Sequence, residues 1–330
     1  MALILSRADV QRCLDMPAAI EAMRIAFTAL STDYAQAPQR LAIGLPGAGL
    51  ALLMPSLLQT NQQYAFGLKI VTVIPDNPQR NIPRIFASIQ LLDAITGQTI
   101  AIMEGSWLTD MRTGAVSGLA TALLARSDAD TLALFGAGAQ ATTQVLAIHT
   151  VRPLREVRVV NRNDAHYHNL VQNLHALLGP SCPLVVRASS SKAALAGATL
   201  VACATASTTP LFSWNEVASG THINAIGAFT ADMCEVDPAT LAHARIVVDQ
   251  REAALAEAGD LIQPLASNLI GGPETWLELG ELVTRKHPGR QKEDEVTFFK
   301  SVGIAVQDAA VATQVYARAC ALGIGLRVDL

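Results

Sequence analysis

Charged and aromatic residues are both scarce in this 330-residue sequence. Charged side chains make up 16% of it and aromatic ones 5%, whereas 51% of the residues are hydrophobic. The net charge is −4 and no run of Lys or Arg occurs, so the chain lacks the basic surface with which proteins bind nucleic acids or anionic membranes. The composition favours a well-buried globular protein, long enough for two domains.

Long hydrophobic runs and grouped cysteines are also missing. The longest apolar windows, Leu132–Ile148 and Ala193–Ala206, are short or interrupted by Gly, Gln and Thr, so neither predicts a membrane span. The first residues show no basic segment with a cleavage-like site, so no signal peptide is predicted. The five cysteines lack Cys-x-x-Cys spacing, which favours reduced thiols in a cytoplasmic protein. No Cys/His cluster indicates a metal site.

The most informative motif is a glycine pattern that follows a short apolar strand. Residues 131–135 lead into Gly136-x-Gly138-x-x-Ala141, and a helix-like segment follows. Gly136 permits a tight turn, Gly138 lets backbone approach a pyrophosphate, and Ala141 lets the helix pack closely on the sheet. An ordinary strand–helix turn can carry the same pattern. The second strand-like run, at 156–160, lies at the distance a βαβ unit requires and favours a dinucleotide site.

The central part of the chain alternates short apolar strands with helices. This alternation predicts an α/β fold, a doubly wound parallel sheet of the Rossmann type, with ligand at the carboxyl ends of the strands. The small polar residues that end two strands, at 205–207 and at Gly227, allow a nicotinamide to come close to backbone. The strand-like runs are Thr131–Phe135, Val157–Val160, Leu184–Arg187, Thr199–Cys203, Thr221–Ile226 and Arg245–Val248, and the helix-like ones include Gln140–His149, Asp164–Leu178 and Lys192–Leu195.

The first 115 or so residues have a different pattern. An amphipathic segment, Met16–Leu30, predicts a helix, and Val302–Ala321 predicts a C-terminal helix that returns to the same layer. Between them, short β-like runs are separated by Gly, Pro and Asn turns, so this part is a second, β-rich layer. Those runs are Gln39–Ile43, Leu50–Met54, Ala65–Val73, Ala87–Leu92 and Thr99–Met103.

Four charged residues stand in unusually apolar or small-residue surroundings. Lys69 is either an edge-strand charge that points to solvent or a buried cation with a task. Arg40, which leads a strand, is either a surface charge or a ligand-binding one. Arg112, just before a helix of small residues, is suited to clamp a carboxylate or pyrophosphate. Asp308 lies in an otherwise apolar helix and must be solvated or paired.

Ten short segments, spread in order along the chain, carry a resemblance to a known family. Together they resemble the ornithine cyclodeaminase/μ-crystallin family over nearly the whole chain. The resemblance implies a Rossmann domain, residues 116–304, inserted into a second α+β domain, residues 1–115 plus 305–330, that carries the substrate site and a homodimer interface. The segments are Met54-Pro55, Gly67–Val71, Pro75–Pro78, Leu92–Gly97, Thr109–Gly118, Gly136–Gln140, Asn161-Arg162, Ile223–Gly227, Asp232–Asp237 and Ser301–Asp308.

The resemblance also implies roles for individual residues. Arg40 and Arg112 would hold the α-carboxylate of a small imino- or amino-acid substrate, and Met54 would line the site. Lys69, near the reacting carbon, and Asp308 would be catalytic. The residues expected at the cofactor are Ser88, Arg112, Thr113, Gly136, Gly138, Ala139, Gln140, Asn161, Arg162, Thr205, Ala206, Ser207, Ile226, Gly227 and Val302.

The end of the second central strand bears on which cofactor is used. Enzymes that use NAD usually place an acid there for the ribose hydroxyls, whereas this chain has Asn161-Arg162. An Arg can accommodate a 2′-phosphate, so NADPH is predicted. Alternatively, Arg162 only stacks on the adenine and NADH serves as well.

Two acids that the cyclodeaminases carry are missing here. The matching positions hold Leu52 and Phe229, which favours the reductase branch of the family: ketimine reductases that reduce Δ1-pyrroline-2-carboxylate or Δ1-piperideine-2-carboxylate to proline or pipecolate. A protonated imine already carries the positive charge that accepts hydride, so positioning suffices. The alternatives are an ornithine cyclodeaminase, an alanine-type amino-acid dehydrogenase and a crystallin-like protein that binds NADPH without turnover.

Overall fold

The chain folds into two units, one of which is discontinuous in sequence. A computed structural model describes residues 1–59 and 64–330. Unit 1 comprises Met1–Arg112 and Gly303–Leu330, and unit 2 comprises Thr113–Val302. The boundaries expected from the sequence, 115/116 and 304/305, lie two or three residues further along the chain.

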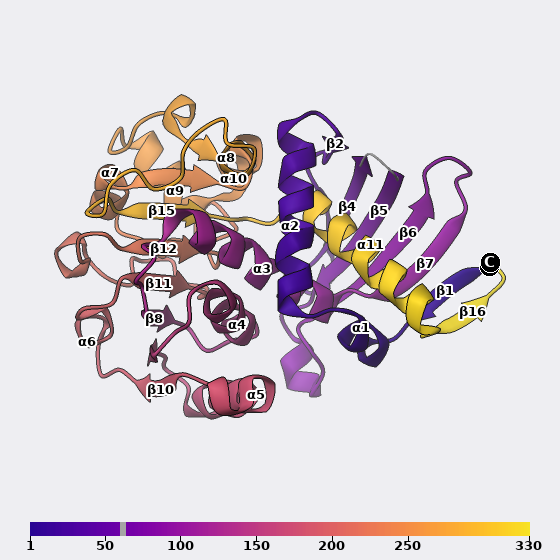
Figure 1. Cartoon of the computed structure of the whole chain (residues 1–330), viewed down its shortest axis with the longest axis horizontal. Helices are drawn as coiled ribbons and strands as arrows, with labels where there is room; N and C mark the ends of the chain where they lie inside the picture. The colour runs from indigo at the N-terminus through magenta and orange to yellow at the C-terminus, as the bar shows by residue number, and fades with distance from the viewer. Residues whose placement is uncertain (60–63) are drawn as a thin grey trace. The chain divides into compact units, whose positions relative to one another are not determined.

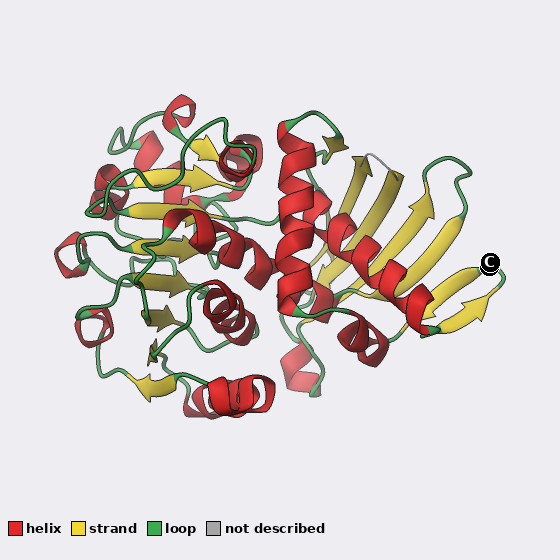
Figure 2. Cartoon of the chain, in the orientation of Figure 1, coloured by secondary structure: helices red, strands yellow, loops and turns green. Residues whose placement is uncertain are grey.

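Unit 1 is a mixed sheet with helices on one face. Its strands run in the order β16-β1-β7-β6-β5-β4-β2, and β3 pairs with β4. The helices α2 (Met16–Ser31) and α11 (Ala305–Leu322) lie across one face of the sheet, as Figures 1 and 2 show. A short helix, α1 (Arg7–Cys13), packs beside them. The strands are β1 (Ala2–Leu5), β2 (Ala35–Gln36), β3 (Leu41–Leu45), β4 (Gly49–Gln59), β5 (Tyr64–Val73), β6 (Ile85–Asp93), β7 (Thr99–Glu104) and β16 (Leu326–Val328).

Helix α11 packs directly on strands β4 and β5. Gly67 makes the close approach possible, because a β-carbon at that position would lie 2.9 Å from the Ala309 Cβ. The helix starts at Ala305, not at Val302 as predicted. Gly303 takes φ of +81°, a left-handed conformation that does not belong to a right-handed helix, and the helix begins two residues after it.

Helix α3 (Ser106–Leu124) carries the chain from unit 1 into unit 2. The Glu104 carboxylate accepts hydrogen bonds from the Ser106 and Trp107 backbone N–H groups at 2.9 and 3.0 Å, which satisfies the first turn of the helix. The prediction that Arg112 precedes this helix is therefore wrong. Arg112 lies in its second turn, because the helix is capped by Glu104 well before the small residues begin.

Unit 2 confirms the predicted α/β class. Its eight strands all pair in parallel, in the order β10-β9-β8-β11-β12-β15-β13-β14. The strands are β8 (Thr131–Phe135), β9 (Glu156–Val160), β10 (Leu184–Arg187), β11 (Leu200–Cys203), β12 (His222–Ala225), β13 (Arg245–Val248), β14 (Leu277–Glu278) and β15 (Thr297–Lys300). The helices are α4 (Ala141–Val151), α5 (Asp164–Leu178), α6 (Ser191–Leu195), α7 (Pro238–His243), α8 (Arg251–Glu257), α9 (Gly259–Ala266) and α10 (Leu279–Val283).

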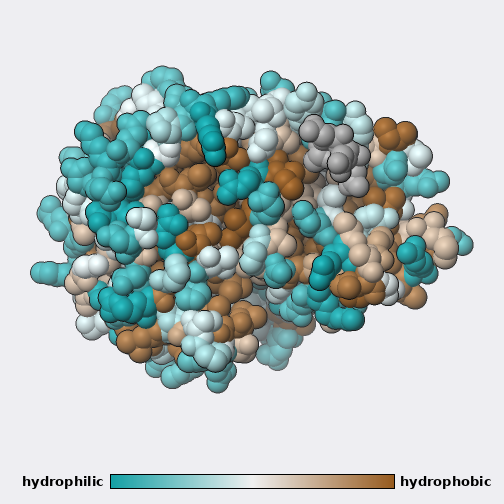
Figure 3. All heavy atoms as spheres, in the orientation of Figure 1, coloured by the Kyte–Doolittle hydropathy of each residue, from teal (hydrophilic) through white to brown (hydrophobic). Residues whose placement is uncertain are grey.

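Both faces of the unit 2 sheet are buried. In β8, Leu132 and Leu134 join one apolar cluster while Ala133 and Phe135 join the other, so every residue of the strand is covered. This explains why the strands read as continuous apolar runs rather than alternating ones. In Figure 3, hydrophilic residues occupy most of the left-hand rim of this unit, where its outer helices meet solvent.

Strand β15 was not predicted, although it lies between β12 and β13 in the middle of the sheet. It is only four residues long and ends in Lys300, so its sequence gives little signal. None of the helices in the described ranges combines the length and hydrophobicity that a membrane span requires.

Candidate active site

Lys69 is a buried cation. Strand β5 pairs with β4 on one side and β6 on the other, so the interpretation of Lys69 as an edge-strand charge is wrong. Its side chain is on the face that α11 covers, and the residue is 3% exposed. Met54 on β4 is its direct cross-strand partner and is also buried.

Two cationic residues from separate elements of unit 1, Lys69 and Arg112, share the carboxylate of Asp308. Lys69 Nζ lies 2.7 Å from Asp308 Oδ2, and Arg112 Nε donates to Asp308 Oδ1 at 3.2 Å. Asp308 is 2% exposed, so it is not on an exposed turn of α11. Arg112 Nη1 also donates to Gln307 Oε1 at 2.9 Å, which fixes the plane of the guanidinium.

This cluster of Lys69, Arg112 and Asp308 holds two positive charges and one negative charge away from water. Burial, with smaller contributions from the nearby Arg112 and Arg40 guanidiniums, lowers the pKa of Lys69 to about 8 against the opposing effect of Asp308. Buried charge that is not balanced is costly, so the arrangement favours the binding of an anion.

The remaining predicted residues of unit 1 occupy different places. Arg40 is half-buried just before β3 and is close enough to Lys69 to affect its titration. Ser88 is an exposed residue of β6 whose cross-strand partner is Ile70, so it lies on the face of the sheet opposite to Lys69. Gln307 was not among the residues predicted to form the site, although it adjoins Asp308 in the segment Ser301–Asp308. Its Nε2 is buried and has no hydrogen-bond partner within the described ranges.

The glycine loop of unit 2 has the features of a pyrophosphate site. Gly136 takes φ of +95°, and a β-carbon there would lie 2.5 Å from the Ala204 carbonyl oxygen. At Gly138, by contrast, a β-carbon would meet nothing within 4 Å, so the backbone borders open space. Ala139 is exposed and Gln140 half-buried just before α4, whose first turn is not capped by the Gln140 side chain, and the start of a helix favours an anion. The loop therefore fits a dinucleotide.

The end of β9 carries Asn161 and Arg162 next to this loop. Arg162 is exposed, and the Asn161 carbonyl accepts a hydrogen bond from Arg187 Nη2 at 3.1 Å. The first carboxylate after the strand, Asp164, is paired with Arg187. Thus Arg162, a cation, lies where NAD-binding proteins usually place the acid that binds the ribose hydroxyls.

The ends of β11 and β12 supply the other predicted cofactor residues. Thr205 and Ser207 are half-buried and Ala206 is exposed after β11, whereas Ile226 and Gly227 are buried after β12. The Glu235 carboxylate, which the sequence did not single out, accepts hydrogen bonds from both loops. Two further predicted residues are also buried: Thr113, whose carbonyl accepts from Gln144, and Val302, whose N–H donates to Asp249.

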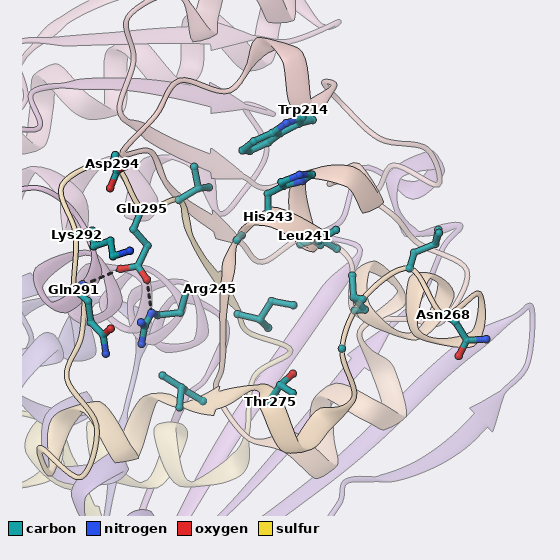
Figure 4. A pocket seen from close by; sticks show the side chains of 18 residues that line it. Trp214, Leu241, His243, Arg245, Asn268, Thr275, Gln291, Lys292, Asp294 and Glu295 are labelled. Carbon is teal, nitrogen blue, oxygen red and sulfur yellow. Dashed lines mark hydrogen bonds and ion pairs between the residues drawn. The ribbon is translucent and has the colours of Figure 1, made fainter.

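An open cavity of about 1100 Å³ lies elsewhere in unit 2 (Figure 4). It is lined by the residues that precede β13 and β15, with Trp214 stacked on His243 at a ring-centroid distance of 4.6 Å. It is therefore at the amino ends of the strands, whereas open α/β sheets bind cofactors at the carboxyl ends. Across residues 1–59 and 64–330, no group of three or more His, Cys, Asp or Glu side chains could hold a metal ion.

Together, the parallel sheet, the glycine loop and the carboxyl-end loops define a Rossmann-type dinucleotide-binding protein, and unit 1 contains a buried charged cluster. The chain belongs to the ornithine cyclodeaminase/mu-crystallin family, whose model matches residues 1–322.

Relatives with named activities match nearly the full length. A Δ1-pyrroline-2-carboxylate reductase of Bacillus cereus is 35% identical over 329 residues, 99% of each chain. The structure of the Thermococcus litoralis Δ1-pyrroline-2-carboxylate reductase, in complex with NADH and L-proline, is 35% identical with a TM-score of 0.93 and covers 99% of this chain and 100% of its own. An archaeal alanine dehydrogenase dimer with bound NAD is 30% identical, with a TM-score of 0.91, and covers 100% of this chain and 99% of its own.

The lowered pKa of Lys69 predicts a specific pH dependence of stability. Above pH 8 the folded chain loses this proton first, while the unfolded lysine keeps it up to its ordinary pKa of 10.5. The unfolded state then binds more protons, so stability rises with pH in that window. Relative to Lys69→Met, the free energy of unfolding should rise by about 1 kcal/mol per pH unit between pH 8 and 10.

Urea unfolding at pH 8, 9 and 10 measures this difference. The exposed Lys192 provides the control, since Lys192→Met should show the same pH dependence as the unaltered chain. Parallel curves for Lys69→Met and the unaltered chain would show that Lys69 titrates as an ordinary lysine.

Proposed function

We propose that this chain is an NAD(P)H-dependent reductase of cyclic imino acids, which converts Δ1-pyrroline-2-carboxylate or Δ1-piperideine-2-carboxylate to proline or pipecolate. The observation that carries the proposal is the buried cluster of Lys69, Arg112 and Asp308, whose excess positive charge fits a small carboxylate. The names of the full-length relatives support the same reaction.

In this proposal Arg112 binds the substrate carboxylate. Asp308 and Gln307 hold the guanidinium in one orientation, and the free amide N–H of Gln307 offers a further donor to a ligand oxygen. Arg40 adds a second positive charge. These contacts position the planar imino acid before reaction, which is most of what a protonated imine requires.

Lys69 holds a proton where the imine nitrogen needs one. Because its pKa is about 8, it is mainly protonated at neutral pH yet can release the proton more readily than an ordinary lysine. Bound nicotinamide supplies the hydride. The residues that would hold the dinucleotide are those of the Gly136–Gln140 loop and of the loops after β9, β11 and β12.

Leu52 and Phe229 stand where the cyclodeaminases carry acids, and their surroundings support a reductase over a cyclodeaminase. Leu52 packs against the apolar cluster of Met54, Val71 and Ala305, and Phe229 is 43% exposed after β12. Neither position offers a carboxylate to take up the side-chain amine of ornithine. An alanine-type dehydrogenase remains the second candidate, because such an enzyme from Archaeoglobus fulgidus is 30% identical over 326 residues.

We infer a preference for NADPH over NADH. The related structures contain NADH or NAD, which supports a nicotinamide dinucleotide as the cofactor. The preference for the phosphorylated form is inferred from Arg162. This exposed guanidinium follows β9 at the position where an acid would repel a 2′-phosphate.

We also infer a homodimer through the open face of the unit 1 sheet. Direct cross-strand partners form one row of Leu41, Leu53, Ile70 and Ser88 across four strands. Of these, Leu41 is 59% exposed and Ile70 is 41% exposed. A large exposed apolar face is unusual on a monomer and suits a second copy of the chain. The related alanine dehydrogenase is a dimer.

Activity assays test the proposed reaction. Oxidation of NADPH or NADH should be fast with a cyclic imino acid and slow with pyruvate plus ammonium, and ornithine with NAD should give no proline. Lys69→Met should lower kcat by about a hundredfold or more and leave NADH binding unchanged. Turnover of pyruvate plus ammonium without turnover of either imine would establish the dehydrogenase instead.

Replacing Arg162 tests the cofactor preference. Arg162→Ala should weaken NADPH binding by about tenfold or more, since a charge-assisted bond to the 2′-phosphate is lost, while NADH binding changes little. Fluorescence titration of each cofactor measures both. Equal losses would mean that Arg162 contacts only the adenosine that the two cofactors share.

Sedimentation equilibrium tests the dimer. The protein should sediment at twice its chain mass of 34.8 kDa. Phe86→Glu places a charge on the open sheet face, next to the proposed row, and should give monomers. Ile95→Glu, in the exposed turn after β6, is the matched control. A monomeric unaltered chain would overturn the proposal.

A further inference from the structure

Glu235 joins the two loops that follow β11 and β12. Its Oε1 accepts hydrogen bonds from the Thr205 backbone N–H and hydroxyl at 2.7 and 2.8 Å. Its Oε2 accepts from the backbone N–H groups of Gly227 and Ala228 at 2.7 and 3.1 Å. The residue is fully buried, so one carboxylate satisfies four donors of two loops that are more than 20 residues apart.

Two other buried charges hold Glu235 in place. Asp260 Oδ1 accepts from the Glu235 and Val236 backbone N–H groups at 2.6 and 3.1 Å, and Asp260 Oδ2 pairs with Lys300 Nζ at 2.7 Å. Asp260 and Lys300 are both 0% exposed. Burial and the nearby Asp260 carboxylate raise the pKa of Glu235, while the Lys300 ammonium and the hydrogen bonds from Thr205 oppose that rise.

Gly227 shows how tightly these loops are set. A β-carbon there would lie 2.1 Å from the Thr205 carbonyl oxygen and 2.5 Å from Glu235 Oε1, so no side chain fits. The loop backbones are thus in direct contact with each other and with the carboxylate. A change at Glu235 must therefore shift the backbone at Thr205, at Gly227 or at both.

We propose that Glu235 is a positioning residue for the nicotinamide ring of the cofactor, acting through Thr205 and Gly227. The inference rests on the dinucleotide site of the proposed function. In a doubly wound sheet the loop after the first strand takes the pyrophosphate, here Gly136–Gln140, and the loops across the switch point, after β11 and β12, face the other half of the dinucleotide. None of the bonds that the structure gives to the Glu235 carboxylate comes from the glycine loop.

A comparison of NADH with ADP-ribose separates this role from general support of the fold. Glu235→Gln keeps the shape of the side chain but replaces one acceptor oxygen with an NH2 group, which then faces N–H donors. NADH affinity should fall by about tenfold or more. ADP-ribose, which lacks only the nicotinamide ring, should bind within about twofold of its affinity for the unaltered chain, since none of the hydrogen bonds to the Glu235 carboxylate comes from the glycine loop that takes the pyrophosphate.

Isothermal titration with NADH and with ADP-ribose measures both affinities without turnover. Glu295→Gln is the matched control: Glu295 is a partly buried glutamate at the amino ends of the same sheet, paired with Arg245 at 2.7 Å. It should change neither affinity. Equal losses of NADH and ADP-ribose affinity in Glu235→Gln would overturn the proposal, as would no loss of either.

Glu235→Asp provides a second variant should Glu235→Gln fail to fold. It keeps the charge but is one methylene shorter, so it should again weaken NADH and spare ADP-ribose, and equal effects on both would overturn the proposal. Unaltered protein that binds NADH but reduces no imino acid would contradict the proposed substrate alone. That outcome leaves the test of Glu235 intact, because both titrations need only the cofactor.

Discussion

The carboxylate of Asp308 is the contact on which unit 1 depends. It lies between Lys69 of β5 and Arg112 of α3, at 2.7 and 3.2 Å, and so brings together residues far apart in sequence. Removing it would leave two buried like charges unscreened, a change that typically costs about 3–5 kcal/mol. Yet Asp308 balances only one of them. In the proposed function, the remaining positive charge is what binds the substrate carboxylate.

Unit 2 uses buried charge in a comparable way at its carboxyl-end loops. Lys300, at the end of β15, pairs with Asp260, which in turn holds the backbone of Glu235. Such networks add little net stability compared with apolar packing, but they impose one arrangement on the groups that they join. Within each unit the buried charged residues therefore fix the positions of the groups that they join, while the apolar strands and helices supply the stability.

Much of the fold could be predicted from the sequence because its signals are local. The run Thr131–Phe135 followed by glycines predicted β8 with correct bounds, and the parallel class followed from the alternation of strands and helices. Strand β15 escaped because four residues ending in a lysine carry no periodicity. The start of α3 escaped because its cap is Glu104, which precedes the helix by two residues.

The candidate site was harder to predict from the sequence than the fold, because the burial and pairing of a side chain depend on residues far away in the chain. The pattern around Lys69 could not distinguish an edge strand from a central one, and only the pairing of β5 on both sides decides it. Glu235 lies in a segment that was noted only for its resemblance. Its four bonds come from residues 205, 227 and 228, which no local pattern connects to it.

The most direct measurement compares the binding of L-proline and L-prolinamide to the protein saturated with NADH. The two ligands differ only in the replacement of the carboxylate by a neutral amide. If the Lys69, Arg112 and Asp308 cluster binds the substrate carboxylate, proline should bind about a hundredfold more tightly than prolinamide. Equal affinities would show that the buried positive charge serves another purpose and would contradict the proposed site.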